Sequence, residues 1–289
     1  MSKDFSEIFK RIPFSYDEIE LVGDSQFTVG FPEKFPDEFK KRVVAAAKSY
    51  VIGNISIDQT LKTYGHYWNL HEGDDLPSNK LLNEMVKCVR TSIDNTINRI
   101  HELHDLPDHV GLLIAGAALL RLERTFRSAI LLQKSQMYFE GICINRLILE
   151  QLSWILSIHN LKDEKLFKIN PTKSITNLTK LVLYAGKMYG LLSYGSHINP
   201  NLWKELIDFS DDKAKLTISS PSKILVNAYH LLLLADIFII ITEIIYRYHF
   251  TKLSSIHVFK EGVKIKKTRE MSRTINKYYK TINKYAKVV

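Results

Sequence analysis

Cysteine is scarce in this chain of 289 residues, and that scarcity excludes two kinds of scaffold. The only cysteines, Cys88 and Cys143, are too few for a disulfide framework or a cysteine-based metal centre. Both lie within apolar periodic stretches, so we expect them to be buried and to act as small hydrophobic side chains. Unpaired thiols are typical of a reducing compartment, and we therefore expect a cytoplasmic protein.

Motifs that identify common enzyme classes are also missing. The chain has no G-x-S-x-G elbow, no Walker phosphate loop, no G-x-G-x-x-G loop and no H-E-x-x-H helix. The polar run around His66 and His71 lacks the i, i+4 histidine pair with a third ligand that zinc enzymes show. We therefore expect no metal site and no cofactor, and the sequence leaves open whether the protein is an enzyme.

Signals for membrane targeting are weak. The opening run MSKDFSEIFKRIPF has no uninterrupted apolar core and no small-residue cleavage site, so we expect no signal peptide. The stretch 229–246 is very apolar but contains Asp236 and Glu243. Each carboxylate near a bilayer centre costs about 2.5–3.5 kcal/mol. We therefore expect a buried core helix there and no transmembrane segment.

Helical periodicity is what the sequence has in abundance. Apolar residues recur every three or four positions, which predicts an all-α fold, a multi-helix bundle. The expected helices cover 37–50, 78–104, 108–133, 136–159, 172–197 and 221–250. A short amphipathic piece at 201–209 and a polar loop at 210–220 precede the last of them.

The two ends of the chain differ from this bundle. The run EIELVGDSQFTVGF places Gly23 and Asp24 between two short apolar runs, a pattern typical of a β-hairpin. We therefore expect three parts. They are an irregular or β-hairpin arm at 1–35, a helical bundle domain at 36–250 and a basic amphipathic C-terminal helix at 251–289.

The expected helix 136–159 is apolar around nearly its whole circumference, which predicts a central position in the bundle. It nevertheless carries Arg146 and Glu150, one helical turn apart. A buried arginine must be paired, and Glu150 alone does not satisfy its five N–H donors. The candidates for a second partner are Asp236, Glu123 and His197. Such a cluster is either a polar network that fixes helix register or part of a functional site.

Three short motifs occur in succession: R-x-E-R-x-F at 121–126, R-L-I-L-E at 146–150 and L-S-x-x-S-H-I-N-P at 192–200. Their order resembles a group of uncharacterised bacterial all-helical proteins, in which an R-x-x-x-E helix precedes a Ser-x-x-x-His-x-x-Pro ending. The resemblance covers about half of the chain, residues 110–250. It implies a standalone or mobile-element gene, in some cases beside defence systems, but no activity. It also implies that four residues converge: Arg146, Glu150, Ser193 and His197.

Arg99 and His104 have the R-x4-H spacing, which is similar to the minimal signature of HEPN ribonucleases. In that family a paired Arg and His act on the RNA backbone. The family prefers a polar residue after the Arg, whereas Ile100 stands here. The alternative is that histidines at this helix end cap carbonyl groups near Pro107.

All the excess positive charge lies at the end of the chain: residues 251–289 have a net charge of +9, and residues 1–250 have none. An apolar stripe repeats there at alternating spacings of four and three: Met271, Ile275, Tyr278, Ile282, Tyr285 and Val289. A cationic row follows it two residues later, about 200° around the helix: Arg273, Lys277, Lys280, Lys284 and Lys287. We expect the apolar face to dock on the body or on a second subunit. The basic face then meets nucleic acid or solvent.

These observations support two hypotheses. The first is a bacterial defence or toxin-like cytosolic protein that binds, or in one version cleaves, nucleic acid. In the cleaving version His197 is the general acid/base, Arg146 stabilises phosphate charge, and Glu150 and Ser193 complete the site. The second is a non-enzymatic helical module for interaction or oligomerisation, in a defence or regulatory complex. The same polar residues are then core contacts, and the C-terminal helix binds a protein partner or a second copy.

Overall fold

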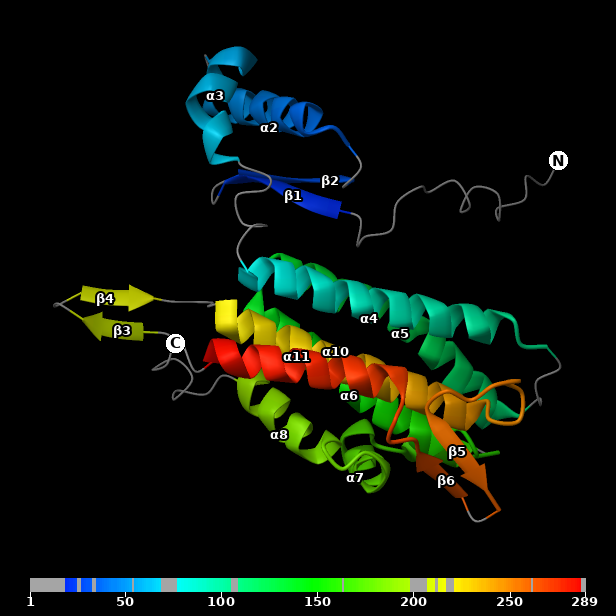
Figure 1. The fold of residues 1–289 in the computed structure, drawn as a ribbon. Coiled ribbons are helices and arrows are strands. Elements are labelled where there is room, and N and C mark those ends of the chain that lie inside the picture. The colour runs from blue at the N-terminus through cyan, green and yellow to red at the C-terminus, as the bar shows by residue number, and fades with distance from the viewer. Residues whose placement is uncertain are drawn as a thin grey trace, which may run out of the picture. The chain divides into compact units, whose positions relative to one another are not determined.

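The computed structural model confirms an all-α, multi-helix fold (Figure 1). It describes residues 19–24, 27–32, 35–53, 55–68, 77–104, 109–162, 164–197, 207–210, 213–216, 221–260 and 262–286. The chain divides into two compact units, Met1–Asn79 and Lys80–Val289. The expected bundle domain at 36–250 is therefore divided between the two units.

The first unit combines a β-hairpin with two helices. Strand β1 (Ile19–Asp24) pairs antiparallel with β2 (Phe27–Pro32), so a hairpin is present as expected. Gly23 and Asp24, expected between the two strands, are instead paired within β1, opposite Thr28 and Phe27. Helices α2 (Asp37–Ile52) and α3 (Ile57–Tyr64) follow. Their small core consists of Val22, Phe31, Val44, Ala45 and Trp68. Helix α2 thus buries its apolar side against the hairpin, because its residues and those of the two strands form one cluster.

The second unit is a helical bundle with α6 at its centre. Its long helices are α4 (Pro77–His101), α5 (Val110–Lys134), α6 (Tyr138–Ile158), α10 (Pro221–Ile245) and α11 (Glu270–Ala286). Helix α6 packs against α5 and α10, and also against two shorter helices, α7 (Pro171–Leu181) and α8 (Ala185–Ser196). The expected central position of the 136–159 helix is confirmed.

Among the described residues, two helices are long and apolar enough to cross a membrane, α6 and α10. Length and composition alone select them, and core helices of soluble proteins have the same properties. Helix α10 is buried over most of its length, and its acidic residues Asp236 and Glu243 are both fully buried. Each of them pairs with an arginine of this chain. The position of α10 therefore agrees with a core helix.

The expected single helix at 172–197 is wrong, because the chain breaks between α7 and α8. Val182 adopts an extended conformation, with φ −120° and ψ 93°, and Leu183 is 83% exposed. The break directs the Tyr184 hydroxyl toward the core, where it donates to Asp236 Oδ2 at 3.2 Å. The apolar spacing of the sequence predicted one continuous helix, and this spacing carries no information about the hydrogen bond between Tyr184 and Asp236.

Two short hairpins replace segments that were expected to be helix or loop. Strands β3 (Ile207–Ser210) and β4 (Lys213–Leu216) pair antiparallel within the expected amphipathic piece and polar loop. Strands β5 (Ile256–Phe259) and β6 (Gly262–Ile265) pair within the expected C-terminal helix, which begins only at Glu270. Ile256 explains the second hairpin, because it packs with Ile240 and Ile244 of α10. Residues 201–206 and 217–220 lie outside the described residues.

Candidate functional site

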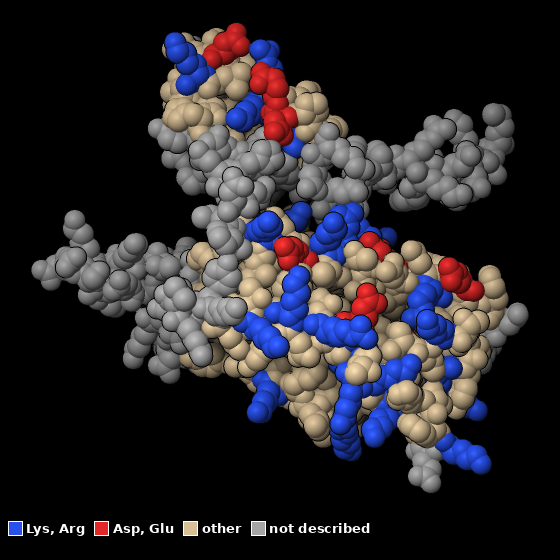
Figure 2. All heavy atoms as spheres, viewed as in Figure 1, with Lys and Arg blue, Asp and Glu red and all other residues tan. Residues whose placement is uncertain are grey.

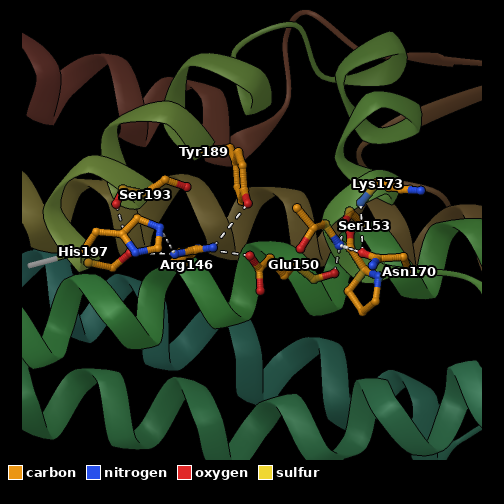
Figure 3. Close-up of polar contacts among 11 residues, drawn as sticks. Arg146, Glu150, Ser153, Asn170, Lys173, Tyr189, Ser193 and His197 are labelled. Carbon is orange, nitrogen blue, oxygen red and sulfur yellow. Dashed lines mark hydrogen bonds and ion pairs between the residues drawn. The ribbon is translucent and has the colours of Figure 1, made fainter.

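Arg146 is the hub of a polar cluster between α6 and α8 (Figure 3). Its Nε donates to Glu150 Oε1 at 3.0 Å, and its Nη1 donates to Ser196 Oγ at 2.9 Å. Nη1 also lies 3.1 Å from His197 Nε2, and Nη2 donates to the Tyr189 hydroxyl at 3.4 Å. Of the four residues expected to converge, Arg146, Glu150 and His197 do so. We use the name Arg146 cluster for five residues: Arg146, Glu150, Tyr189, Ser196 and His197.

Ser193, the fourth expected residue, does not bond to Arg146 but contacts Ser196. Its hydroxyl is buried and has no hydrogen-bond partner among the described residues, and its carbonyl accepts from Ser196 Oγ at 3.2 Å. It therefore supports Ser196 rather than contacting His197. Sequence reasoning missed Ser196 and Tyr189 as partners of Arg146. Their spacing from Ser193 places all three on one side of α8, and that signal was present in the sequence.

The other candidate partners of Arg146 are used elsewhere. Asp236 pairs with Arg269, and Glu123 pairs with Arg127 at 2.8 Å. Burial lowers the pKa of Arg146, but its hydrogen bonds to Tyr189 and Glu150 outweigh this effect and raise the pKa overall. The guanidinium is therefore charged, and Glu150 supplies the compensating carboxylate.

The contact with Arg146 bears on which nitrogen of the His197 ring can accept a hydrogen bond. A guanidinium has only donors, so His197 Nε2 must accept, and the proton of a neutral ring then lies on Nδ1. A general base needs a free lone pair, and the lone pair on Nε2 is already in use. Among the described residues, no hydrogen bond joins the hydroxyl of Ser193 to this ring. Through Arg146, the hydrogen bonds of the cluster join α6 to the C-terminal end of α8.

The Arg146 cluster is partly exposed to solvent. The Arg146 and Glu150 side chains are 22% and 19% exposed, and His197 lies at the surface. Cys143, almost one turn before Arg146, is exposed, so its expected burial is wrong, whereas Cys88 is partly buried. Partial burial of the Cys143 thiol raises its pKa, and the negative charge of Glu140 raises it further. The positive charge of Arg146 acts in the opposite direction, but the pKa is raised overall. The thiol is therefore protonated at neutral pH and is a weak nucleophile.

The R-x4-H pair is not assembled as a pair. Arg99 Nη1 donates to Glu243 Oε1 at 3.2 Å, Nη2 donates to the Lys252 carbonyl at 2.7 Å, and the guanidinium lies 4.2 Å from the centre of the Phe250 ring. His104 is exposed, and no hydrogen bond joins it to Arg99 in the described structure. Arg99 thus anchors the segment after α10 to α4.

Helix α11 docks on the bundle through its apolar stripe. The described members of that stripe are buried: Met271, Ile275, Tyr278 and Ile282. The Tyr278 hydroxyl lies 3.4 Å from Glu84 Oε2 and 3.7 Å from Cys88 Sγ, both on α4. The ring of Tyr279 lies against Tyr229 of α10. The expected docking of this stripe on the body of the chain is confirmed.

The opposite side of α11 carries exposed cations, namely Arg273, Lys277 and Lys280, which we call the α11 basic face. Lys277 is 67% exposed and lies 3.7 Å from Glu84 on α4. The side chain of Lys284 and all of Lys287 lie outside the described residues. Figure 2 shows this side of the bundle, where Lys and Arg are more numerous than Asp and Glu.

Not all the C-terminal cations are free for a ligand. Arg269 is bound to Asp236, and Lys266 Nζ donates to the Leu253 carbonyl at 2.5 Å. Lys252, Lys260, Lys264 and Lys267 are exposed.

The described residues hold no group of three His, Cys, Asp or Glu side chains that could bind a metal ion. No family model, curated protein or solved structure matches this chain.

Proposed function

We propose that the protein binds nucleic acid through the α11 basic face. One observation carries the proposal. The apolar stripe of α11 is buried within the same chain, so Arg273, Lys277 and Lys280 are held outward on a docked helix. Cations fixed in this way attract the phosphate backbone and release its counterions on binding. Phosphate contacts do not depend on base identity, so the binding is largely independent of sequence.

Binding without cleavage is the version that the geometry supports. His197 Nε2 accepts from Arg146, and the Ser193 hydroxyl has no hydrogen-bond partner within the described part of the chain. The Arg146 cluster then serves to fix α8 on α6. A defence or toxin-like role in the bacterial cytoplasm remains a prediction from the resemblance. It is tested by comparing phage resistance of cells that express the wild type with cells that express a variant lacking the α11 basic face.

A binding assay at several salt concentrations tests the proposal. The test variant replaces Arg273, Lys277 and Lys280 by Gln, and the control replaces three exposed lysines near α7 by Gln: Lys162, Lys168 and Lys173. Both variants lose the same net charge. Because each lost phosphate contact reduces the slope of log K against log salt by about 0.7–0.9, we expect the test variant to lose about 2–3 in slope. Equal losses in both variants would contradict a localised site.

A second function is favoured by exposed apolar side chains beside α8. Leu183, Leu191 and Tyr194 are 83%, 61% and 44% exposed. Such residues favour an interaction module that binds a protein partner or a second copy. The described α11 stripe is already occupied, so a partner would use α8 instead. Sedimentation of the wild type and of Leu191→Glu tests this. An unchanged mass for both, at all concentrations, would remove the homo-oligomer version.

A further inference from the structure

We infer that the nucleic acid is single-stranded, and that Tyr279 on the flank of α11 stacks against its bases. This inference rests on the proposed function, and it adds the class of ligand. Tyr279 is 54% exposed and directly precedes Lys280 in the chain. An exposed aromatic ring beside a row of cations is the combination by which proteins hold unpaired nucleotides, because every base has a face on which a ring can stack.

The ring of Tyr279 is supported from the core side. Its centre lies 6.1 Å from the centre of the Tyr229 ring, and the two planes are inclined by 38°. Tyr229 belongs to α10 and is partly buried, and burial followed by the neighbouring Tyr279 raises its pKa. The Tyr229 hydroxyl is therefore neutral at physiological pH. The two rings form a supported aromatic surface rather than a single mobile side chain.

The geometry of α11 determines the order of the side chains around the helix, starting from Tyr279. At about 100° per residue, Lys280 lies about 100° around the helix from Tyr279, and Arg273 lies about 120° away in the same sense. Asn276 and Asn283 lie between them, about 40–60° from Tyr279, and both are exposed. From the α10 side outward, α11 thus presents an aromatic ring, two amides and then cations. Amides offer donors and acceptors to base edges, while cations meet phosphates.

This order suits a single strand better than a duplex. In a duplex the base faces are stacked inside the helix, so the ring of Tyr279 has no base face to stack on. An unpaired strand can place its backbone along Arg273 and Lys280 and turn a base toward Tyr279. The stacking contact is therefore available to single strands alone.

The test compares a labelled single strand of about 20 nucleotides with a duplex of the same length, long enough to cover one binding site. The variants are Tyr279→Ala, Tyr279→Phe and, as control, Tyr248→Ala, which removes a 76% exposed tyrosine located after α10. We expect Tyr279→Ala to weaken single-strand binding by about 5- to 100-fold, with an unchanged salt slope. Tyr279→Phe keeps the ring, so we expect it and the control to bind within about twofold of the wild type.

The outcomes separate this inference from the proposed function. If the duplex binds as tightly as the single strand and Tyr279→Ala alters neither affinity, the stacking inference is overturned. In that case a reduced salt slope for the Arg273, Lys277 and Lys280 variant still upholds binding by the basic face. If the wild type binds neither oligonucleotide at low salt, the stacking inference and the proposed nucleic-acid binding are both wrong. Circular dichroism of Tyr279→Ala shows whether the fold is intact, and Tyr279→Phe keeps the packing against Tyr229 in any case.

Discussion

Asp236 is a fully buried carboxylate in α10, and three hydrogen bonds account for its position there. Arg269 donates from Nε at 2.8 Å and from Nη2, and the Tyr184 hydroxyl donates at 3.2 Å. The two-pronged contact matches the guanidinium to the carboxylate. These contacts join three parts of the chain: the turn before α8, α10 and the start of α11.

Glu243 is also fully buried, two turns further along α10. It accepts from Arg99 and from the backbone N–H groups of Ser254 and Ser255, the latter two at 2.7 Å each. The segment that leads from α10 to β5 therefore folds back onto this carboxylate. Both acids of the most apolar helix thus hold C-terminal segments in place.

Replacing Arg269 by Met is expected to destabilise the protein, because it leaves the Asp236 charge buried with Tyr184 as the one donor that remains among the described residues. Loss of one partner of a buried ion pair costs about 3–5 kcal/mol. Adding Asp236→Leu removes the orphaned charge, so the double variant should regain most of that loss. Urea unfolding of the wild type and the variants measures this. A loss below about 1 kcal/mol for Arg269→Met would show that water reaches the carboxylate.

The partly buried ring of His230 makes stability depend on pH. Burial lowers its pKa from 6.5 to about 4, so the fold favours the neutral ring. Its folded-state pKa lies below its unfolded value, so its contribution is intact above about pH 6.5 and is lost as pH falls toward 4. The loss is at most about 3 kcal/mol, and residual solvent contact of the ring reduces it.

Substitution by Gln isolates this contribution. We expect His230→Gln to lose less stability than the wild type between pH 6.5 and 4. His101→Gln removes an exposed histidine of α4 and should follow the wild type. Burial also lowers the pKa of His159, which adds to the acid sensitivity of every variant alike, so the comparison is between variants. Parallel pH profiles for all three proteins would rule out His230 as a cause.

The junction of α5 with the end of α6 depends on a glycine. The Gly111 N–H donates to the Leu161 carbonyl at 3.0 Å, and a Cβ at this position would overlap the carbonyl oxygens of Leu161 and Ile158. Gly111→Ala must therefore move backbone, and we expect a loss of more than about 2 kcal/mol. Gly190 in α8 is the matched control, because a Cβ there has no neighbour within 4 Å. Gly190→Ala should gain about 0.5–1 kcal/mol in thermal unfolding.

Long apolar stripes could be predicted because one physical effect determines them. The stripe from Met271 to Ile282 has the spacing of a docked helix, and burial of that face dominates its energetics. The break at Val182 could not be predicted in this way, because it serves a hydrogen bond between Tyr184 and Asp236, which are far apart in sequence. The β5–β6 hairpin likewise depends on the contact of Ile256 with α10. Short strands are fixed by tertiary contacts more than by local propensity.

The candidate site was predictable to a similar degree. The spacing of Arg146 and Glu150 places them one turn apart, and the resemblance added His197. The direction of the hydrogen bond at His197 Nε2 could not be obtained from a motif, because it depends on how α8 packs on α6. That direction decides whether the Nε2 lone pair is free to accept a proton. For α11, the arrangement of cations opposite the apolar stripe followed from sequence spacing alone.

Charge is divided between the parts of the molecule, with no net charge in residues 1–250 and +9 in residues 251–289. A uniform spread of the same charge would make a weaker local field for an anionic ligand. Because α11 belongs to the unit Lys80–Val289, the proposed binding surface lies within that unit. The described residues of the first unit form a separate core around Trp68.

A fragment that begins at Pro77, the first residue of α4, should therefore fold and bind by itself. It keeps the large continuous core of the bundle, whereas the described part of the first unit has a core cluster of five buried residues, which predicts a lower stability. Calorimetry of the full chain should show a minor transition at lower temperature and a major one that the fragment reproduces. The fragment should also keep the salt slope of the full chain. A fragment that melts without a cooperative transition would show that the first unit completes the core of the bundle.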